Sequence, residues 1–282
     1  MQLWYSLVAF LPFEWAQSDG FLFMKHALLA VLLLMPVLGL AGTAVVHHRM
    51  AFFSDALGHG AFTGVAIGSL VGLAHPQISS LLFALLFAVL VTWVQHSTRM
   101  GRDTVIGALA SLCVAIGVFL ATWNGRSIGR LANFLVGDLL SVAPQDLGIA
   151  LILALLFFPI WVFLGNRLLL LGCSSSLAIS RGIRPLWLEM TFAGLLAVVV
   201  TFSLQWLGLL TVNACLVLPA ATGRLLARSA RSHAYWSIGL ATFCGLVGLL
   251  ASWYADSVAG ASIVMALAVA FFIALFLAKW RR

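Results

Sequence analysis

The sequence predicts an all-α fold, a polytopic membrane bundle of about eight or nine transmembrane helices with additional short or re-entrant helices. Hydrophobic residues make up 63% of the 282 residues and charged residues only 8%, whereas soluble domains contain about 25% charged residues. Apolar stretches of roughly 20 residues recur along the whole chain, as helices that cross a ~30 Å hydrocarbon layer require. They lack the alternation of an outer-membrane barrel, so helices rather than strands are expected.

The N-terminal segment does not have the pattern of a cleaved signal peptide. No basic side chain precedes Trp4, and Pro12 and Glu14 interrupt the apolar run. The aromatic residues of the segment favour an N-terminal helix that lies in the membrane interface. These aromatic residues are Trp4, Phe10, Phe13 and Trp15.

Nine stretches have the length and apolarity of a membrane span. We predict spans near residues 21–46, 52–73, 77–97, 104–122, 146–166, 186–206, 208–227, 234–254 and 260–278. A further apolar stretch, residues 131–142, is too short to cross and is expected to form a short or re-entrant helix covered by protein or an aqueous cavity. If that stretch crosses, or if residues 186–227 form one broken span, the number of crossings becomes eight to ten.

The cations predict the orientation of these spans. With the N-terminus outside, twelve fall on the cytoplasmic side, namely Arg49, Arg99, Arg102, Arg167, Arg181, Arg184, Arg224, Arg228, Arg231, Lys279, Arg281 and Arg282. Only Lys25, Arg126 and Arg130 fall outside, which is a strong positive-inside pattern. The net charge of +7 therefore indicates topology and contact with anionic membrane lipid. No basic face interleaved with aromatic residues indicates a nucleic-acid partner.

The second span carries two aligned rows of residues. A stripe of small residues recurs every four positions and would let another helix approach closely; it consists of Gly60, Gly64, Gly68 and Gly72. Asp55, His59 and Thr63 form the adjoining row. Ionisable residues inside a span face the bundle interior or a pathway, so Asp55 and His59 are candidates for a metal or proton site. The alternatives are a helix N-cap for Asp55 and a polar bridge between helices for His59.

Other chemical motifs are absent from the sequence. The cysteines Cys113, Cys173, Cys215 and Cys244 are scattered singly, so neither disulfides nor a thiolate metal site is predicted. A Walker A loop requires G-x-x-x-x-G-K-[ST], and neither Lys25 nor Lys279, the only lysines, lies in that context. We therefore expect no ATPase activity in this chain and no bound cofactor.

Residues 49–64 closely resemble a family signature, because Ser54 to Gly64 read S-D-A-x-x-H-x-x-x-x-G. This signature is that of the zinc/manganese/iron ABC-importer permeases. Similar stretches follow in the same order at residues 103–107, 134–140, 178–183, 207–210 and 218–222, so the resemblance extends over about residues 20–280. One departure is that Gly260 lacks the proline that usually precedes it in the family's last motif.

The resemblance implies a single permease domain over residues 1–282 with the compact type II architecture, in the bacterial cytoplasmic membrane. Two copies would form a homodimer, with cytoplasmic ABC ATPase subunits below it and an extracytoplasmic metal-binding protein above it. The cargo would be zinc, manganese or iron, with zinc favoured. The cytoplasmic segment 173–185 would contact the ATPase, with Ala178, Arg181 and Gly182 matching the family's coupling loop.

The resemblance also assigns Asp55 and His59 as the metal-contacting pair of the pathway. If a dimer axis runs beside the second span, two copies of the pair would supply two nitrogen and two oxygen ligands, which suits tetrahedral zinc. His75 is the best secondary candidate for receiving metal, whereas His26, His47, His48, His96 and His233 are interpreted as interfacial residues. We expect Glu189 to form a cytoplasmic salt bridge with Arg184 or Arg181.

Two other functions fit the residues less well. A type II ABC permease for a siderophore or cobalamin would need a wider cavity and a longer chain. A secondary transporter or channel would use Asp55 and His59 as a proton relay.

Overall fold

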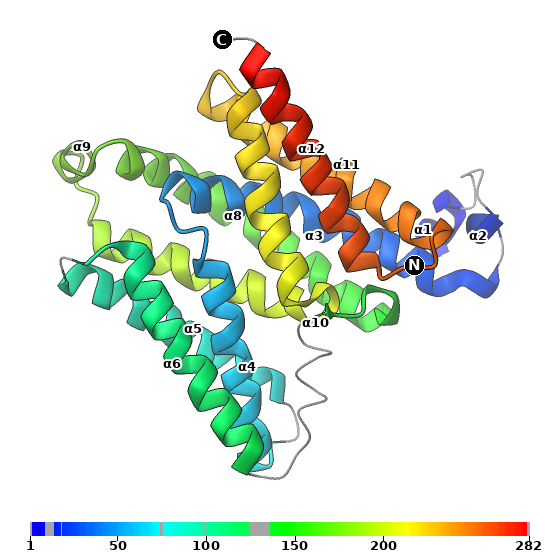
Figure 1. Ribbon diagram of the computed structural model, residues 1–282, viewed down its shortest axis with the longest axis horizontal. Coiled ribbons are helices and arrows are strands. Elements are labelled where there is room, and N and C mark those ends of the chain that lie inside the picture. Colours follow the sequence, from blue (N-terminus) through cyan, green and yellow to red (C-terminus); the bar gives the residue numbers. More distant parts are fainter. Residues whose placement is uncertain are drawn as a thin grey trace.

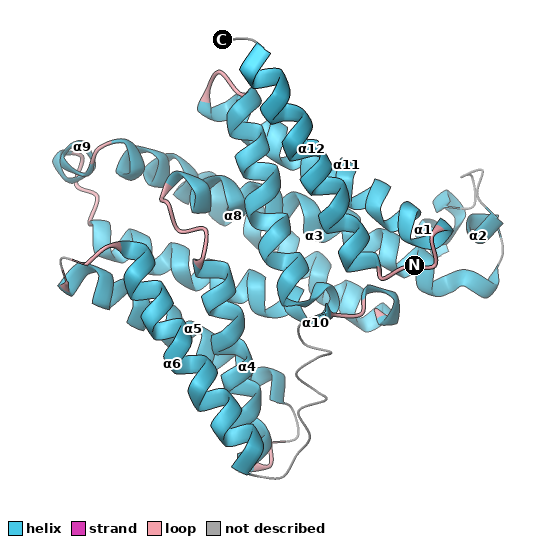
Figure 2. Cartoon of the chain, viewed as in Figure 1, coloured by secondary structure: helices cyan, strands magenta, loops and turns pink. Residues whose placement is uncertain are grey.

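A computed structural model describes residues 2–8, 14–17, 19–73, 76–98, 100–123 and 136–280. Within these ranges the chain is helical and contains no strand, which confirms the predicted fold class (Figures 1 and 2). The long helices are α3 (Leu22–His47), α4 (Phe53–Val71), α5 (Pro76–Ser97), α6 (Arg102–Trp123), α8 (Pro144–Cys173), α10 (Pro185–Leu226), α11 (Ala230–Tyr254) and α12 (Ala259–Trp280). The short ones are α1 (Gln2–Val8), α2 (Glu14–Gln17), η1 (Asp19–Phe21), η2 (Leu139–Ser141) and α9 (Ser175–Ser180).

Helix α10 is too long to be one membrane span. Its 42 residues would extend about 63 Å if straight, roughly twice the ~30 Å hydrocarbon thickness. Gly208 interrupts it with φ 75° and ψ 162°, and the second half (yellow) runs back beside α12 (Figure 1). The predicted spans 186–206 and 208–227 therefore correspond to the two halves of α10.

The other predicted spans each coincide with one helix. Seven described helices, α10 counted once, are long and apolar enough to cross a membrane. Helix α4 falls outside that group because Asp55 and His59 lower the hydropathy of its 19 residues. The spans alternate in direction, so the ends at Arg102, Arg181 and Arg224 lie on the same side, which we call the cytoplasmic side.

Some predictions fall on residues that the structure does not describe. Residues 131–135 of the short apolar stretch, His75, Arg99, Arg126, Arg130, Arg281 and Arg282, and the aromatic residues Phe10 and Phe13 lie outside the described ranges. In the described part of the short stretch, residues 139–141 form the 3-10 turn η2. Trp15 is buried in the protein at 1% exposure, and Trp4 donates from Nε1 to the Lys25 carbonyl at 3.0 Å.

The buried centre of the bundle consists of α3 and α10. Both are apolar on nearly all sides, as expected for helices surrounded by protein. Close approach depends on glycine: a Cβ on Gly42 would overlap the Leu216 carbonyl of α10, and a Cβ on Gly39 would lie 2.8 Å from Cβ of Ala241 in α11. Ser237 of α11 also donates to the Gly39 carbonyl at 2.5 Å. Small residues thus set the helix spacing, as is usual in lipid.

Three glycines meet where α10 reverses direction. Gly137 has φ 70° and Gly208 φ 75°, a region that residues with a side chain rarely adopt. A Cβ on Gly137 would overlap the backbone nitrogen of Gly208, and a Cβ on Gly208 would overlap the backbone of Val136. A Cβ on Gly260 would lie 2.5 Å from Oγ1 of Thr211. Three segments of the chain that are distant in sequence are therefore locked together on the side opposite the arginines.

Gly208→Ala is expected to destabilise the protein by about 1–3 kcal/mol from backbone conformation alone, with the backbone overlap adding to it. Gly239→Ala is the matched control, because a Cβ there meets no atom within 4 Å and its φ is helical. The control should be neutral or stabilising by up to ~1 kcal/mol. Thermal unfolding of the purified chain in detergent measures both; equal unfolding midpoints would contradict the role of Gly208.

Candidate functional site

The candidate site begins at the cytoplasmic end of α4. The helix starts after Phe52, which is the N-cap residue and makes no side-chain capping bond. Asp55 therefore lies in the first turn of α4 and is not its N-cap. Ser54 Oγ donates to Oδ1 of Asn213 in the second half of α10 at 2.6 Å. This bond turns the face of α4 that carries Ser54 toward α10. The neighbouring row, which contains Asp55 and His59, does not face α10 in the same way.

Asp55 and His59 face one another along this row. Oδ2 of Asp55 lies 3.5 Å from Nε2 of His59, across the i, i+4 spacing of one helical turn. The side chains are 38% and 28% exposed respectively. Among the described residues, neither side chain has another hydrogen-bond or ion-pair partner. The pair is therefore accessible and not fully engaged by the protein.

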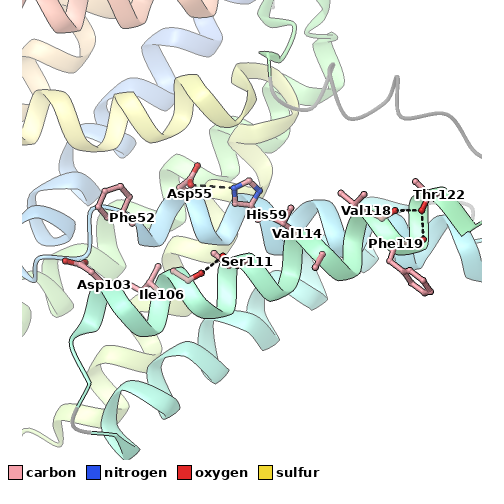
Figure 3. Close-up of a pocket in the computed structure, with 13 residues that line it drawn as sticks. Phe52, Asp55, His59, Asp103, Ile106, Ser111, Val114, Val118, Phe119 and Thr122 are labelled. Atoms are coloured by element: carbon pink, nitrogen blue, oxygen red, sulfur yellow. Dashed lines mark hydrogen bonds and ion pairs between the residues drawn. The ribbon is translucent and has the colours of Figure 1, made fainter.

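The pair lines a cleft of about 940 Å³ between α4 and α6. Asp103 lies at one end of the cleft and Thr122 at the other, with Asp55 and His59 between them (Figure 3). The α6 wall is formed by small or apolar residues, namely Ile106, Gly107, Ala110, Ser111, Val114, Ala115, Val118 and Phe119. The other polar side chains of this mostly apolar lining are Asp103, Ser111 and Thr122. Ionisable residues in a membrane cleft make the pair a candidate site for an ion in transit.

A single chain supplies an incomplete metal shell. Carboxylate oxygen and imidazole nitrogen are suitable donors for zinc, manganese or ferrous iron. Within the described ranges, however, no group of three or more His, Cys, Asp or Glu residues is close enough together to hold a metal. The described residues of one chain therefore do not complete a metal shell at Asp55 and His59.

The glycine stripe of α4 positions this row, although its members differ in what they contact. Gly64 meets the start of α5, where an added Cβ would lie 2.7 Å from the Ser79 carbonyl oxygen. A Cβ added at Gly60 would lie 3.3 Å from Cγ of Phe87. Gly68 is buried. The structure places Gly72 differently from the prediction: it is the exposed C-cap of α4 with φ 76°, and a Cβ there would contact nothing within 4 Å. The packing stripe therefore ends before Gly72, because the helix itself ends there.

Thr63 fixes α4 against α6 on the other side. Its hydroxyl donates to the Cys113 carbonyl of α6 at 2.7 Å. A Cβ on Gly117 of α6 would lie 2.8 Å from the same hydroxyl oxygen. The width of the cleft is therefore set by a buried hydrogen bond one helical turn from His59.

The cytoplasmic salt bridge of Glu189 has different partners from those predicted. Arg102, the first residue of α6, donates from Nη2 to Oε1 at 2.8 Å, and Nδ1 of His96 in α5 lies 3.5 Å from Oε2. Arg181 and Arg184 make no ion pair with Glu189, because its side chain is 7% exposed and turned into the bundle. The pairing was missed because Arg102 is 87 positions away in sequence.

The remaining described histidines have structural partners. A ring nitrogen of His48 lies 3.2 Å from the Leu168 carbonyl, and burial lowers the pKa of His48. His26 pairs with the Tyr5 hydroxyl at 2.7 Å, and His233 with the Ala220 carbonyl at 2.8 Å. Nε2 of His47 lies 4.0 Å from Sγ of Cys173, which is exposed, whereas the other cysteines are buried. All four cysteines are free thiols.

The predicted coupling segment forms a short, well-defined helix. Ser174 caps α9, and its Oγ accepts from the Leu177 amide at 3.4 Å. Ala178 is fully buried, whereas Arg181 is exposed at the C-cap. Gly182, at φ 74°, turns the chain. The left-handed Gly182 follows the last turn of α9, and Pro185 then begins α10.

The fold and the cleft together define a multi-pass membrane transport protein. The ABC 3 transport family matches residues 20–278, and the chain belongs to this family. It is a multi-pass protein of the cytoplasmic membrane.

Two relatives and one solved structure align with nearly the whole length of this chain. The high-affinity zinc uptake system membrane protein ZnuB of Haemophilus influenzae is 31% identical, over 89% of this chain and 95% of the relative. The manganese import system permease protein ScaB of Streptococcus gordonii is 27% identical, over 93% and 94%. A chain in the structure of PsaBC from Streptococcus pneumoniae in complex with Fab has a TM-score of 0.77 and 26% identity, over 97% of this chain and 95% of that chain.

The ion pair between Arg102 and Glu189 is expected to couple α6 to α10. Because Arg102 is 39% exposed, water replaces part of the lost interaction, so Glu189→Gln should cost about 1–2 kcal/mol rather than the ~3–5 kcal/mol of a fully buried pair. A double-mutant cycle with Arg102→Gln should give an interaction free energy of at least about 0.5 kcal/mol in thermal unfolding. Additive effects would show that the two side chains do not stabilise one another.

Proposed function

We propose that this chain is the membrane permease of an ABC importer that moves a divalent transition metal ion into the cytoplasm, with Asp55 and His59 binding the ion in transit. One observation carries the proposal. In a chain of the ABC 3 transport family, a carboxylate and an imidazole lie 3.5 Å apart in a membrane cleft and have no other described partner. Zinc is the favoured cargo, because a mixed nitrogen and oxygen donor set suits it better than manganese, which prefers oxygen.

A second copy of the chain completes the site in this proposal. Two copies of Asp55 and His59 across a two-fold axis would provide four ligands, the usual number for zinc. The surface around the cleft supports such contact: Gly107, Ser111 and Ala115 follow one another at four-residue spacing on α6 and are all exposed. Stripes of small residues favour helix association in lipid, so α6 is a suitable surface for the homodimer.

An incomplete shell within one chain is also suited to transport. A site that held the ion with four strong ligands at all times would act as a trap rather than a pathway. If the ligands come from two chains, a small change in the separation of the copies alters the coordination and hence the affinity. Tight capture would then be the task of an extracytoplasmic metal-binding protein.

ATP hydrolysis belongs to separate cytoplasmic subunits in this proposal, because the chain has no Walker A loop. Helix α9 is the suitable contact, since it is short, exposed on most sides and anchored by the buried Ala178. Its end at Arg181 lies only a few residues before α10, which contacts α4 and α5. A push on α9 would therefore be transmitted directly to the helices beside the cleft.

Metal uptake tests the roles of Asp55 and His59. In the assembled importer, Asp55→Ala and His59→Ala should each reduce radioactive zinc uptake by about tenfold or more, because a metal loses one strong ligand per chain. Ser97→Ala is the control, since Ser97 lies outside the cleft, is exposed and donates to the Trp93 carbonyl of its own helix. Uptake by the control should stay within about twofold of the unaltered importer.

The same assay separates the proposal from its alternatives. Measuring the uptake of manganese and ferrous iron beside that of zinc shows which of the three metals the importer prefers. Undiminished uptake of all three metals in the Asp55 and His59 variants would contradict the proposal. Uptake of a metal chelate in place of the free ions would indicate a siderophore or cobalamin permease, and metal uptake without ATP would indicate a secondary transporter.

Coupling is tested at the end of α9. Gly182→Ala forces a side chain into φ 74°, at a cost of about 1–3 kcal/mol, and should disturb the turn. Arg181→Ala removes an exposed charge. Both variants should lower ATP-driven zinc uptake at least severalfold while zinc binding by the purified permease stays unchanged. Arg228→Ala, in the loop before α11, is the control; unaffected uptake in both Arg181 and Gly182 variants would refute a coupling role.

A further inference from the structure

A second cavity, of about 610 Å³, lies at the cytoplasmic end of the bundle. It is formed by the last turns of α8, the turn after α9 and the first turns of α10. Three arginines line it, Arg167 from α8 and Arg181 and Arg184 from the turn. We call this cavity the arginine pocket. It is separate from the cleft that contains Asp55 and His59.

The arginine pocket lies at the depth of the lipid headgroups. Arg167 is 23 positions after Pro144, the first residue of α8, which corresponds to about 35 Å of helix. That length exceeds the ~30 Å hydrocarbon layer, so the final turns of α8 reach the headgroup region. Trp187, in the first turn of α10, lines the pocket and is 62% exposed. An exposed tryptophan at a span end is typical of the membrane interface.

No ion pair among the described residues balances the charge in the arginine pocket. All three arginines are exposed, and none forms an ion pair within the described ranges. Glu189, the nearest acidic residue along the chain, is turned away and bonded to Arg102. Three guanidinium groups around one cavity therefore lack an anionic partner.

The walls of the arginine pocket are amphipathic in the way that a phospholipid is. Leu164 of α8 precedes Arg167 by one turn and Leu188 of α10 follows Arg184 by one turn, so both provide apolar lining on the membrane side of the arginines. Leu170 adds apolar lining on the cytoplasmic side of Arg167. Asn166 adds an amide at the same level as Arg167. Guanidinium groups bind phosphate through paired hydrogen bonds, and the apolar surface continues along membrane-spanning helices where acyl chains lie.

We infer that the arginine pocket binds the headgroup of an anionic phospholipid such as phosphatidylglycerol. The phosphate lies among Arg167, Arg181 and Arg184, and the acyl chains follow α8 and α10 into the membrane. A lipid fits better than an acidic surface of the ATPase, because Arg167 belongs to a spanning helix six residues before its end and not to the coupling segment. The inference does not depend on the identity of the cargo.

Quenching of tryptophan fluorescence by brominated lipids tests this inference. The full-length permease is placed in nanodiscs with dibrominated phosphatidylglycerol or dibrominated phosphatidylcholine at equal mole fraction. Subtracting the emission of Trp187→Phe isolates the signal of Trp187. We expect dibrominated phosphatidylglycerol to quench Trp187 more strongly than dibrominated phosphatidylcholine. In Arg167→Gln/Arg184→Gln, the preference of the pocket for phosphatidylglycerol should fall about fivefold for each arginine removed.

Matched variants control for charge and folding. Arg224→Gln/Arg228→Gln removes the same charge from the same face but outside the pocket, and should keep the preference. Arg167→Lys/Arg184→Lys retains the charge and should keep most of the preference for phosphatidylglycerol. Circular dichroism and gel filtration show whether each variant is folded.

Three results would overturn the inference. One is equal quenching by the two lipids in the unaltered permease. Another is that Arg167→Gln/Arg184→Gln leaves the lipid preference unchanged but weakens co-purification of the ATPase. That result would make the pocket an ATPase contact. The third is displacement of the lipid by millimolar inorganic phosphate, which would indicate a site for a soluble anion.

Discussion

The close backbone contact between Gly137 and Gly208 is the constraint on which the rest of this bundle depends. Both glycines have positive φ, and a side chain on either would overlap the other's backbone or its neighbour's. This contact lets α10 reverse direction, so that one helix becomes two spans packed on α3. The second half of α10 then carries Asn213, which holds Ser54 at 2.6 Å. That bond, the Gly64 contact with α5 and the Thr63 bond to α6 together orient α4, and with it Asp55 and His59.

The sequence was sufficient to predict the helical class and the approximate position of each span, because hydropathy and span length are local properties. It left open whether residues 186–227 form one broken span or two, since a glycine alone does not reveal a positive φ. The Asp55 and His59 pair was also predictable from the i, i+4 spacing and the surrounding signature. The cleft itself was not, because its second wall is α6.

The incorrect details arose where a local pattern was extended to a three-dimensional contact. Glu189 was assigned to nearby arginines, yet its partner is Arg102, which comes close because α5 packs against both α6 and α10. Gly72 continues the four-residue spacing but lies just past the end of α4, where its left-handed conformation serves as a cap. The sequence shows which residues are close along the chain, but it does not show which residues the packing of helices brings together.

The cytoplasmic side connects the proposed coupling segment to the transport cleft. Helix α9 leads through Gly182 into α10, where Glu189 binds Arg102 at the start of α6. The next residue, Asp103, lines the cleft together with Asp55 and His59 (Figure 3). In the proposed mechanism, a displacement of α9 by an ATPase would reach the wall of the proposed metal site through one helix and one ion pair. The arginine pocket lies beside the same turn, so an anionic lipid bound there would contact the segment that moves.

In the proposed transport mechanism, two chains share one metal ion through Asp55 and His59. X-ray absorption spectroscopy of zinc bound to the purified permease, together with the zinc content per chain, tests it most directly. The account predicts one zinc per two chains, with two imidazole nitrogens and two carboxylate oxygens at about 2.0–2.2 Å. One zinc per chain, or an unchanged spectrum after His59→Ala, would contradict it.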